Sequence, residues 1–428
     1  MIKNKKHIKN KTWFKLDNAG TVFPGQNTQT WSNVIRTSLT LKEEINPDLL
    51  LKAVKRCLPR FPTMAVRLRN GLFWHYIEHN PEPPIVLPDA NNPCLRIKYD
   101  ENNRYMFRIF YYKNKISLEI FHALTDGYGA TVFLNTITAE YLRLKGYEIP
   151  SGGMVFDINE KPKSGEIEDS FVKYASKTAK EKLPRFKTYH RIGERMPKHT
   201  SIITTGYIPV DVVKAKAKEK GVTITEYISS VLMLIHMRFQ KNENVNQKNV
   251  VMQIPVNCRN QFTSETLRNF SVNYQIRIDP TWGEYTFDEV LRHLSLSLRL
   301  NNNPKHLSTM FASNLGIEKN PFLRFLPIQI KDLAVGLVFV FGAERTTSSV
   351  FTNVGIVKIP EEMKEHIESY TLMPSPGRLN GARVGAGSVG NVMSITFANM
   401  YTNTDIEREF FRFLVKEGIP VKIESNKQ

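Results

Sequence analysis

A proline-, glycine- and lysine-rich stretch at residues 151–200 divides the chain into two segments of similar organisation. Each segment mixes short runs of alternating polar and apolar residues, typical of strands, with runs of helical periodicity. The stretch itself is weakly periodic and predicts a linker. We therefore expect an α/β protein in which an N-terminal lobe at residues 1–150 and a C-terminal lobe at residues 201–428 face each other across a cleft.

Composition narrows the class of partner. The 428 residues are 41% apolar, which is enough for a sizeable core. Lys and Arg outnumber Asp and Glu by 59 to 41, a surplus that favours phosphate-bearing cofactors, acidic carrier proteins, membrane surfaces or nucleic acid. The lysines are scattered without interleaved aromatic residues, so we expect no nucleic-acid partner. There is no P-loop or Rossmann glycine fingerprint.

The three cysteines are widely spaced and form no CxxC pair, a pattern that indicates a reducing cytoplasm. The basic start, residues 1–11, lacks the apolar centre of a signal peptide, and no uncharged apolar run reaches the ~18 residues of a membrane span. The most apolar candidate, residues 321–342, is interrupted by three charged residues. It predicts a buried helix or strand, with contact to a membrane surface as the alternative.

In the first half, Asn46-Pro47 predicts the start of a helix that ends near Pro59. Residues 115–121, KISLEIF, alternate as a half-buried strand does, and residues 130–144 have helical periodicity. The other strand-like runs of this half are residues 63–78, 94–100 and 104–112.

In the second half, a helix capped by Thr225 is predicted over residues 225–239. Further helices are predicted over residues 211–221, about 286–300 and 406–418. The predicted strands are residues 202–210, 249–256, 273–279, 350–360, 391–401 and 419–425.

The string FHALTDG, residues 121–127, joins a strand-like run to a helical one. A side chain at such a turn can point out of the scaffold, and histidine, with an ordinary pKa near ~6.5, is suited to removing a proton at neutral pH. Gly127 and Gly129 allow a sharp turn, and Asp126 can brace the loop by pairing with an arginine. His122 is thus a candidate general base. The alternative is that His122 ends a hairpin and Asp126 only caps the next helix.

Two other patterns could indicate a zinc site and a reactive thiolate, but their surroundings argue against both. HYIEH, residues 75–79, spells a zinc motif, but its surroundings predict a strand, where residues four apart lie ~13 Å from each other, too far to share one zinc ion. Cys258 stands beside Arg259, as an activated thiolate does, yet a small buried cysteine after a strand is much commoner.

The HxxxDG string resembles the signature of the superfamily of CoA-dependent acyltransferases with the chloramphenicol-acetyltransferase-like fold. This superfamily includes alcohol O-acetyltransferases, plant acyl-CoA transferases, polyketide-associated acyltransferases and non-ribosomal condensation domains. Similar to it are also LLLKAVKRCLPRFP at residues 49–62, PVNCR at 255–259, Asn269-Phe270 and FTNVGIVKIP at 351–360. Among the subfamilies the chain looks most like bacterial alcohol acetyltransferases. The resemblance implies two lobes, each a mixed sheet with helices, around a central tunnel.

The resemblance further implies transfer of an acyl group, in the simplest case acetyl, from acyl-CoA to an alcohol. His122 is then the general base, and no covalent enzyme intermediate is needed. Asp126 and Gly127 are structural, with Asp126 paired to Arg259. Acyl-CoA is a co-substrate, and no permanently bound cofactor and no metal are expected.

Donors to the tetrahedral oxyanion are needed as well, and the candidates are Thr352 and Asn353. Three departures qualify the resemblance. Phe121 stands where condensation domains carry a second histidine, which favours an alcohol over an amine as acceptor. Asn257 replaces the aspartate of the PVDLR-like segment, and residues 268–276 replace the DFGWG string of the plant enzymes.

Two alternatives stay open. The acyl group can arrive on the phosphopantetheine arm of a carrier protein, with formation of an ester or an amide, or the fold can serve as a non-catalytic binding protein. Either CoA or an acidic carrier could meet the lysines at 214, 216, 218 and 220 or those between 173 and 198, unless these are solvated surface. We expect a cytoplasmic monomer acting on a small-molecule alcohol that the sequence does not identify.

Overall fold

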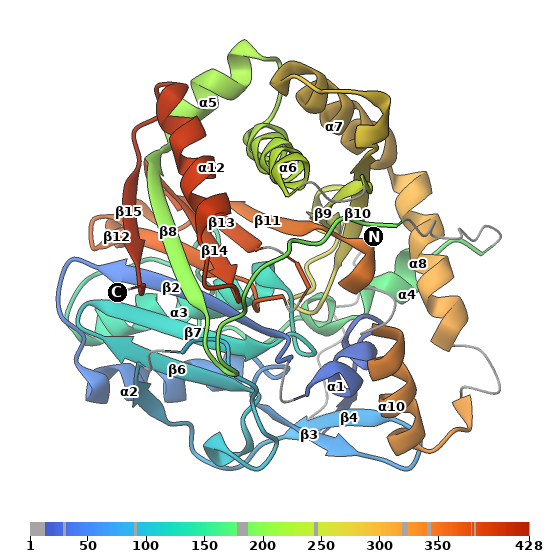
Figure 1. Cartoon of the computed structure of the whole chain (residues 1–428). Coiled ribbons are helices and arrows are strands. Elements are labelled where there is room, and N and C mark those ends of the chain that lie inside the picture. The colour runs from blue at the N-terminus through green and yellow to red at the C-terminus, as the bar shows by residue number, and fades with distance from the viewer. Residues whose placement is uncertain are drawn as a thin grey trace, which may run out of the picture.

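The computed structural model describes residues 13–28, 31–89, 92–177, 187–243, 247–318, 324–339, 344–377, 379–380 and 382–427. The basic start and residues 178–186 of the predicted linker lie outside the described residues. Figure 1 shows two lobes, with the first half of the chain in the lower one and most of the second half in the upper one. Each lobe has its own core of buried apolar side chains.

The N-terminal lobe is built on a five-stranded sheet, and one of its strands comes from the second half of the chain. Its order is β12 (Ile367–Met373), β2 (Val34–Leu41), β7 (Lys115–Phe121), β6 (Phe107–Tyr112) and β5 (Val86–Pro88). Neighbouring strands are antiparallel except β5 and β6. Two helices cover this sheet: α3 (Gly127–Leu144) packs on β2 and β7, and α2 (Pro47–Cys57) packs on α3. A separate small sheet has the order β1 (Trp13–Lys15), β4 (His75–His79) and β3 (Val66–Asn70).

The C-terminal lobe contains a mixed seven-stranded sheet. Its order is β10 (Ser271–Ile278), β9 (Val250–Asn257), β11 (Ser349–Ile356), β13 (Arg383–Val389), β14 (Val392–Asn399), β8 (Ile202–Pro209) and β15 (Lys422–Ser425). The helices packed beside it are α5 (Val210–Glu219), α6 (Ile224–Asn242), α7 (Phe287–Asn301) and α12 (Asp405–Lys416).

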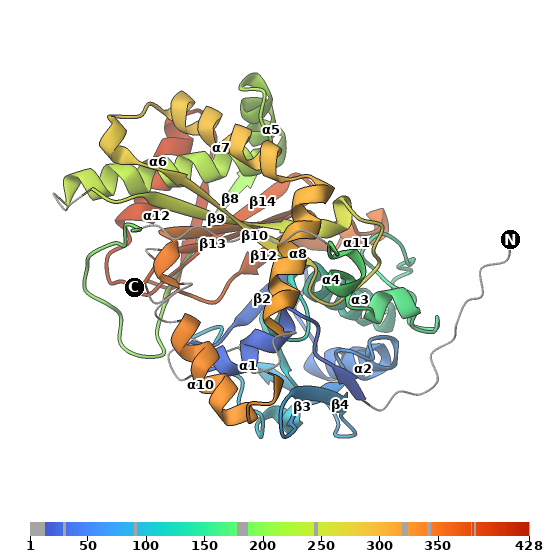
Figure 2. The ribbon, with the colours of Figure 1, turned by 90° about the vertical axis from the view of Figure 1, so that its right-hand side faces the viewer.

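The remaining helices lie between or beside the lobes: α1 (Phe23–Gln26), α4 (Ser170–Tyr174), α8 (Pro304–Glu318), α10 (Ile328–Val338) and α11 (Glu361–Lys364). α10 lies against α1, and both views show this pair at the edge of the lower lobe (Figures 1 and 2). In the part of the chain that the structure describes, no helix combines the length and the apolarity that a bilayer crossing demands.

The predicted helix starts are largely confirmed, with one correction. The side chain of Asn46 accepts hydrogen bonds from the N–H groups of residues 48 and 49 and so caps α2 as predicted. The helix assigned to a Thr225 cap begins instead after Thr223. Thr223 accepts from the N–H of Glu226, whose carboxylate accepts from the N–H of Thr223, and this reciprocal capping box fixes the start of α6.

Two predictions about strands are wrong for one physical reason. β7 is buried on both faces, not on one, because Arg36 and Arg108 form ion pairs with the buried Glu119. Residues 94–100 form no strand and instead cover this second face, where the N–H of Cys94 donates to Glu119 at 2.6 Å.

The prediction of a buried element at residues 321–342 is also wrong. Residues 328–338 form α10, but Ile328 is its one buried residue, while Leu333 and Val338 are 66% and 67% exposed. Residues 321–323 and 340–342 lie outside the described ranges. The helix presents one face to α1 and leaves the other to solvent, so an apolar run can be a surface helix here.

Candidate active site

His122 is the first residue after β7, in the turn that leads into α3. Its backbone N–H donates to the carbonyl oxygen of Asn33 at 2.9 Å. One face of its ring stacks on Phe23, which begins α1, with ring centroids 4.6 Å apart and an interplanar angle of 22°. The ring is partly buried and fixed in orientation, so its reactivity depends on the hydrogen-bond partners of Nδ1 and Nε2.

Asn269 fixes the tautomer of His122. The Asn269 amide nitrogen donates to the backbone carbonyl of His122 at 3.0 Å and to the carboxylate of Asp17 at 3.1 Å. Both of these partners are acceptors, so the opposite end of the amide, Oδ1, faces Nδ1 of His122 at 3.0 Å. Oδ1 can only accept, hence Nδ1 carries the proton and Nε2 carries the lone pair. Within the described residues Nε2 has no hydrogen-bond partner.

Asp17 anchors Asn269 from the other side. Its carboxylate is fully buried and accepts from the backbone N–H groups of Gly20 at 2.6 Å and Asn269 at 3.2 Å. Arg268 forms an ion pair with it at 3.5 Å. Burial raises the pKa of Asp17 to about 6, although Arg268 opposes this shift. One hydrogen-bond network thus connects Asp17, Asn269 and His122 and joins the N-terminal segment to both lobes.

Asp126 and Arg259 meet as an ion pair across the lobes, with 2.8 Å between Oδ2 and a guanidinium nitrogen. Asp126 also caps α3 by accepting from the N–H of Gly129, and it accepts from the N–H of Phe270 at 2.9 Å. Capping and pairing therefore occur together, and the two interpretations of Asp126 are not exclusive. Arg259 donates further to the backbone carbonyls of Thr266 and Arg268, so this pair holds the segment that carries Asn269.

A cavity of about 620 Å³ opens between the lobes at His122. His122, Gly127 and Thr352 all line it, whereas Asn353 does not: its amide donates to Thr225 at 3.1 Å. By surface area the lining is mostly apolar, although about half of the lining residues are polar. Its other polar lining residues are Asn18, Thr21, Gln26, Asn33, His75, Asp126, Gln253, Asn269, Ser271, Asn273, Ser313, Asn314, Lys331, Asp332, Glu344, Thr347, Ser375 and Arg383.

The charge state of His122 suits proton removal. Burial lowers its pKa below the ordinary value, and the Arg383 cation adds to this effect, while Asp126 and the hydrogen bond to Asn269 oppose it. A histidine with a lowered pKa is neutral at pH 7. Its Nε2 can therefore accept a proton from a group bound in the cavity.

Comparisons with known proteins bear on the family and the fold of the chain. The model of the alcohol acetyltransferase family matches residues 165–280, a stretch that contains both Arg259 and Asn269. No curated protein sequence matches the chain significantly. Among solved structures, the polyketide synthase associated protein 5 from Mycobacterium tuberculosis aligns over 94% of this chain and 96% of its own, at 13% identity and a TM-score of 0.61.

The trichothecene 15-O-acetyltransferase from Fusarium sporotrichioides aligns over 97% of both chains, at 12% identity and a TM-score of 0.60. The starter condensation domain of rhizomide synthetase, solved with C8-CoA and Leu-SNAC, aligns over 94% of both chains, at 12% identity and a TM-score of 0.57. The chain has the fold of acetyltransferases and condensation domains. The two-lobed α/β architecture predicted from the HxxxDG resemblance is therefore confirmed. At these identities the likeness concerns the fold.

The other two patterns singled out in the sequence are the HYIEH string, whose His75 lines the same cavity as His122, and Cys258. His75 and His79 belong to the strand β4, and the ring of His75 bonds to Asn70 and to Asp332, each near 3.0 Å. Across the described ranges, no group of three or more His, Cys, Asp or Glu is placed to hold a metal ion. Cys258 is buried, and burial raises the pKa of its thiol to about 12, so it is a poor nucleophile at neutral pH.

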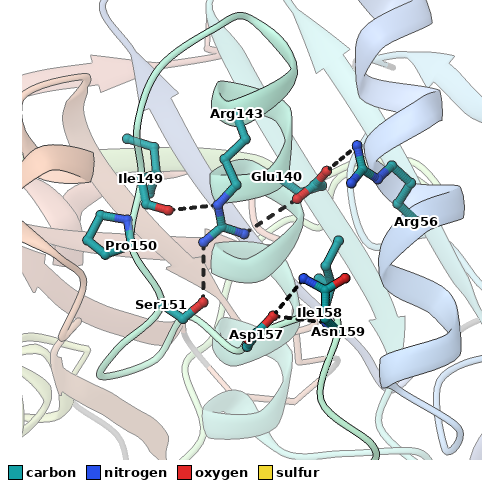
Figure 3. A pocket seen from close by; sticks show the side chains of 9 residues that line it. All are labelled: Arg56, Glu140, Arg143, Ile149, Pro150, Ser151, Asp157, Ile158 and Asn159. Carbon is teal, nitrogen blue, oxygen red and sulfur yellow. Dashed lines mark hydrogen bonds and ion pairs between the residues drawn. The ribbon is translucent and has the colours of Figure 1, made fainter.

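A second, smaller cavity of about 370 Å³ lies beside α3 (Figure 3). Its buried carboxylate, Glu140, is held between Arg56 at 3.0 Å and Arg143 at 3.4 Å. Arg143 also donates to the carbonyl of Ile149. The two arginines balance the charge of this carboxylate, which indicates a structural ion-pair cluster at the end of α3.

Sequence reasoning missed three contributors to the site. Asn269 is part of a family-like pattern in the sequence but carries no sign of its contact with His122. Asp17 and Phe23 lie in a segment without clear periodicity. No local signal could have found them, because they reach His122 through contacts between segments more than ninety residues apart in the chain.

Proposed function

We propose that the protein transfers an acyl group from acyl-CoA to an alcohol, with Nε2 of His122 as the general base. The observation that carries this proposal is the hydrogen bond between Asn269 and Nδ1, which leaves Nε2 as a free acceptor at the inter-lobe cavity. The match to the alcohol acetyltransferase family and the C8-CoA bound to the rhizomide condensation domain support it. The formal charge of +18 suits a donor that carries phosphates.

In this mechanism the acceptor hydroxyl donates a hydrogen bond to Nε2. As its oxygen attacks the thioester carbonyl, the O–H proton passes to Nε2 and a tetrahedral oxyanion forms. The oxyanion collapses, the C–S bond breaks, and the imidazolium returns the proton to the departing CoA thiolate. The products are the ester and CoA-SH, and His122 is again neutral.

Residues around His122 take supporting roles in the proposal. Thr352 lines the cavity, and its hydroxyl can donate a hydrogen bond to the oxyanion. Asn353 is the weaker candidate because its amide already donates to Thr225. Asp126 and Arg259 hold the turn and the Asn269 segment in place rather than touching substrate.

The acceptor is proposed to be an alcohol because no second ionisable group stands beside His122 in the chain. The neighbouring residue, Phe121, is buried in the core and packs near Tyr99 at a centroid distance of 6.4 Å. An amine acceptor would arrive largely protonated at neutral pH and needs an additional base to become a nucleophile.

A donor assay tests the proposal. The purified protein is offered acetyl-CoA or longer acyl-CoA, in parallel with the same acyl groups on a carrier protein, together with a panel of alcohols and amines. Release of free thiol and mass-spectrometric detection of ester are both recorded. We expect ester from the CoA arm. Turnover only with the carrier arm would favour a condensation enzyme, and no turnover with any donor would favour a binding protein.

The histidine needs its own control. His122→Ala should lower kcat/KM by about 10²–10⁴-fold, the usual contribution of a positioned base. His79→Ala removes an exposed histidine from β4 and should leave the rate as it is. Equal rates for His122→Ala and the unaltered protein would contradict the role of His122.

A further inference from the structure

Arg383, the first residue of β13, lines the same cavity as His122. Its guanidinium lies over the ring of Trp31, 4.2 Å from the centroid. Its Nε is buried and has no hydrogen-bond partner among the described residues. Within the residues that the structure describes, no carboxylate forms an ion pair with Arg383.

The missing partner is physically unusual. Burial lowers the pKa of Arg383 to about 10, so the side chain still carries its charge at neutral pH, and the nearby Glu344 carboxylate counteracts part of the effect. Arg383 is half-buried, and a charge that loses part of its water is unfavourable unless it is paired. A cation whose charge Glu344 offsets only in part, in a cavity whose lining area is mostly apolar, therefore indicates a ligand site rather than a stabilising contact.

The position of Arg383 relative to His122 is fixed by a short segment. The indole N–H of Trp31 donates to the side-chain oxygen of Asn33 at 2.6 Å. The backbone carbonyl of the same Asn33 accepts from the N–H of His122 at 2.9 Å. Asn33 therefore holds both the Trp31 ring, on which the guanidinium lies, and the backbone of His122. A ligand group bound at Arg383 would lie in the same cavity as the His122 ring.

We propose that Arg383 binds a carboxylate carried by one of the two substrates, an inference that rests on the proposed acyl transfer. The carboxylate can belong to the acceptor, which is then a hydroxy acid, or to the acyl group, which is then the half-thioester of a dicarboxylic acid. The phosphates of CoA are not the ligand, because they sit at the opposite end of the pantetheine arm from the thioester.

The chemistry of the site favours a carboxylate over a phosphate monoester. With one face of the guanidinium on Trp31, its edge remains for a planar group that accepts two parallel hydrogen bonds. One carboxylate neutralises one guanidinium. A dianion would leave excess negative charge beside the buried Glu344.

Matched substrates distinguish the two sources. The reference pair is acetyl-CoA with 1-butanol or 1-octanol. The acceptor arm replaces the alcohol by 4-hydroxybutanoate or 8-hydroxyoctanoate, and the donor arm replaces acetyl-CoA by malonyl-CoA. We expect one arm to exceed the reference in kcat/KM, and Arg383→Met to lower the ratio of that arm to the reference by about 10- to 100-fold, since hydrogen bonds to charged groups are strong.

A control separates this role from a structural one. Arg412 on α12 is exposed and pairs with Glu409 at 3.0 Å, so Arg412→Met should leave the ratio unchanged. If Arg383 only supported the fold, Arg383→Met would depress all arms equally. An unchanged ratio in Arg383→Met, in both arms, would overturn the proposal.

Binding gives an independent readout should the proposed function itself fail. Without turnover in any arm, the same compounds are titrated against the protein and followed by tryptophan fluorescence, with Trp31→Phe to assign the signal. Tighter binding of a carboxylate compound than of its neutral counterpart, lost in Arg383→Met, supports the site. Equal binding by both proteins overturns it.

Discussion

The side-chain oxygen of Asn269 lies 3.0 Å from Nδ1 of His122, while the nitrogen of the same amide reaches the backbone carbonyl of His122 and the carboxylate of Asp17. An amide placed in this way can present only its oxygen to the ring. It therefore sets which imidazole nitrogen is protonated, a role that a carboxylate often has beside histidine in enzymes.

Replacement of Asn269 should therefore damage catalysis without removing the base. In Asn269→Leu the ring loses both its fixed tautomer and its orientation, so we expect kcat/KM to fall by about 10²-fold. The hydrogen bond also raises the pKa of His122, so the acid limb of the pH–rate profile should move to lower pH. Asn273→Leu, which removes another amide from the cavity wall, should leave the acid limb in place. An unmoved acid limb in Asn269→Leu would refute this role.

The pH dependence of the intact protein follows from the burial of His122. Because burial lowers the pKa of His122, kcat/KM should rise with pH along an acid limb centred below ~6.5 and stay level at neutral pH. The measurement is a pH–rate profile under subsaturating substrate. An acid limb centred above the ordinary histidine pKa would contradict the proposed protonation state.

The lowered pKa of His122 should also make the free energy of unfolding depend on pH. A group whose pKa is depressed in the folded state contributes stability above its unfolded pKa and loses it as the pH falls. Denaturant unfolding between about pH 7.5 and 5 should therefore show the unaltered protein losing stability relative to His122→Gln. Taking the difference removes the contribution of Asp17, whose raised pKa of about 6 acts in the opposite direction. A difference that does not vary with pH would be evidence against a depressed pKa.

How much of this site could be predicted depends on how local each signal is. The alternation of residues 115–121 and the helical period after them correctly located His122 at a strand-to-helix turn, because both periods are set by neighbouring residues. The same alternation led to the wrong prediction that the face of β7 with Glu119 is exposed to solvent. A glutamate in a strand usually faces solvent, and the sequence does not show that two arginines pair with this one in the interior.

Contacts between distant segments were beyond the sequence. Asn269 is 147 residues from His122 and 252 residues from Asp17, and they meet only because the lobes pack together. β12 joins the sheet of the other half for the same reason. The meeting of Asp126 and Arg259 was expected from resemblance to a family, which carries such long-range information, and not from any periodicity.

Asp126 should be more important for stability than for the chemical step. Its side chain and that of Arg259 are 5% and 6% exposed, so Asp126→Asn leaves a buried guanidinium without its counter-charge. We expect a loss of about 3–5 kcal/mol in the free energy of unfolding, measured with urea. The exposed pair of Glu409 and Arg412 is the matched comparison, and Glu409→Gln should cost about 1 kcal/mol or less. Similar losses of unfolding free energy in both variants would show that the buried pair contributes no more to stability than the exposed one.

The two glycines at the start of α3 should differ sharply in their tolerance of a methyl group. A Cβ on Gly129 would lie 2.2 Å from the carbonyl oxygen of Leu267, in the segment that carries Asn269, whereas a Cβ on Gly127 would meet only a methyl of Val354 at 3.3 Å. Gly129→Ala must push that segment away and should cost about 1–3 kcal/mol of stability, with a fall in kcat as Asn269 moves from His122.

Gly127→Ala is the control for this comparison, because alanine is the better helix former and its methyl finds room after a small shift of a side chain. We expect it to be neutral or slightly stabilising. Denaturant unfolding and acyl-transfer assays on both variants measure the contrast. If Gly129→Ala were as stable and as active as Gly127→Ala, the close approach of the two lobes at Leu267 could not be what positions Asn269 against the histidine.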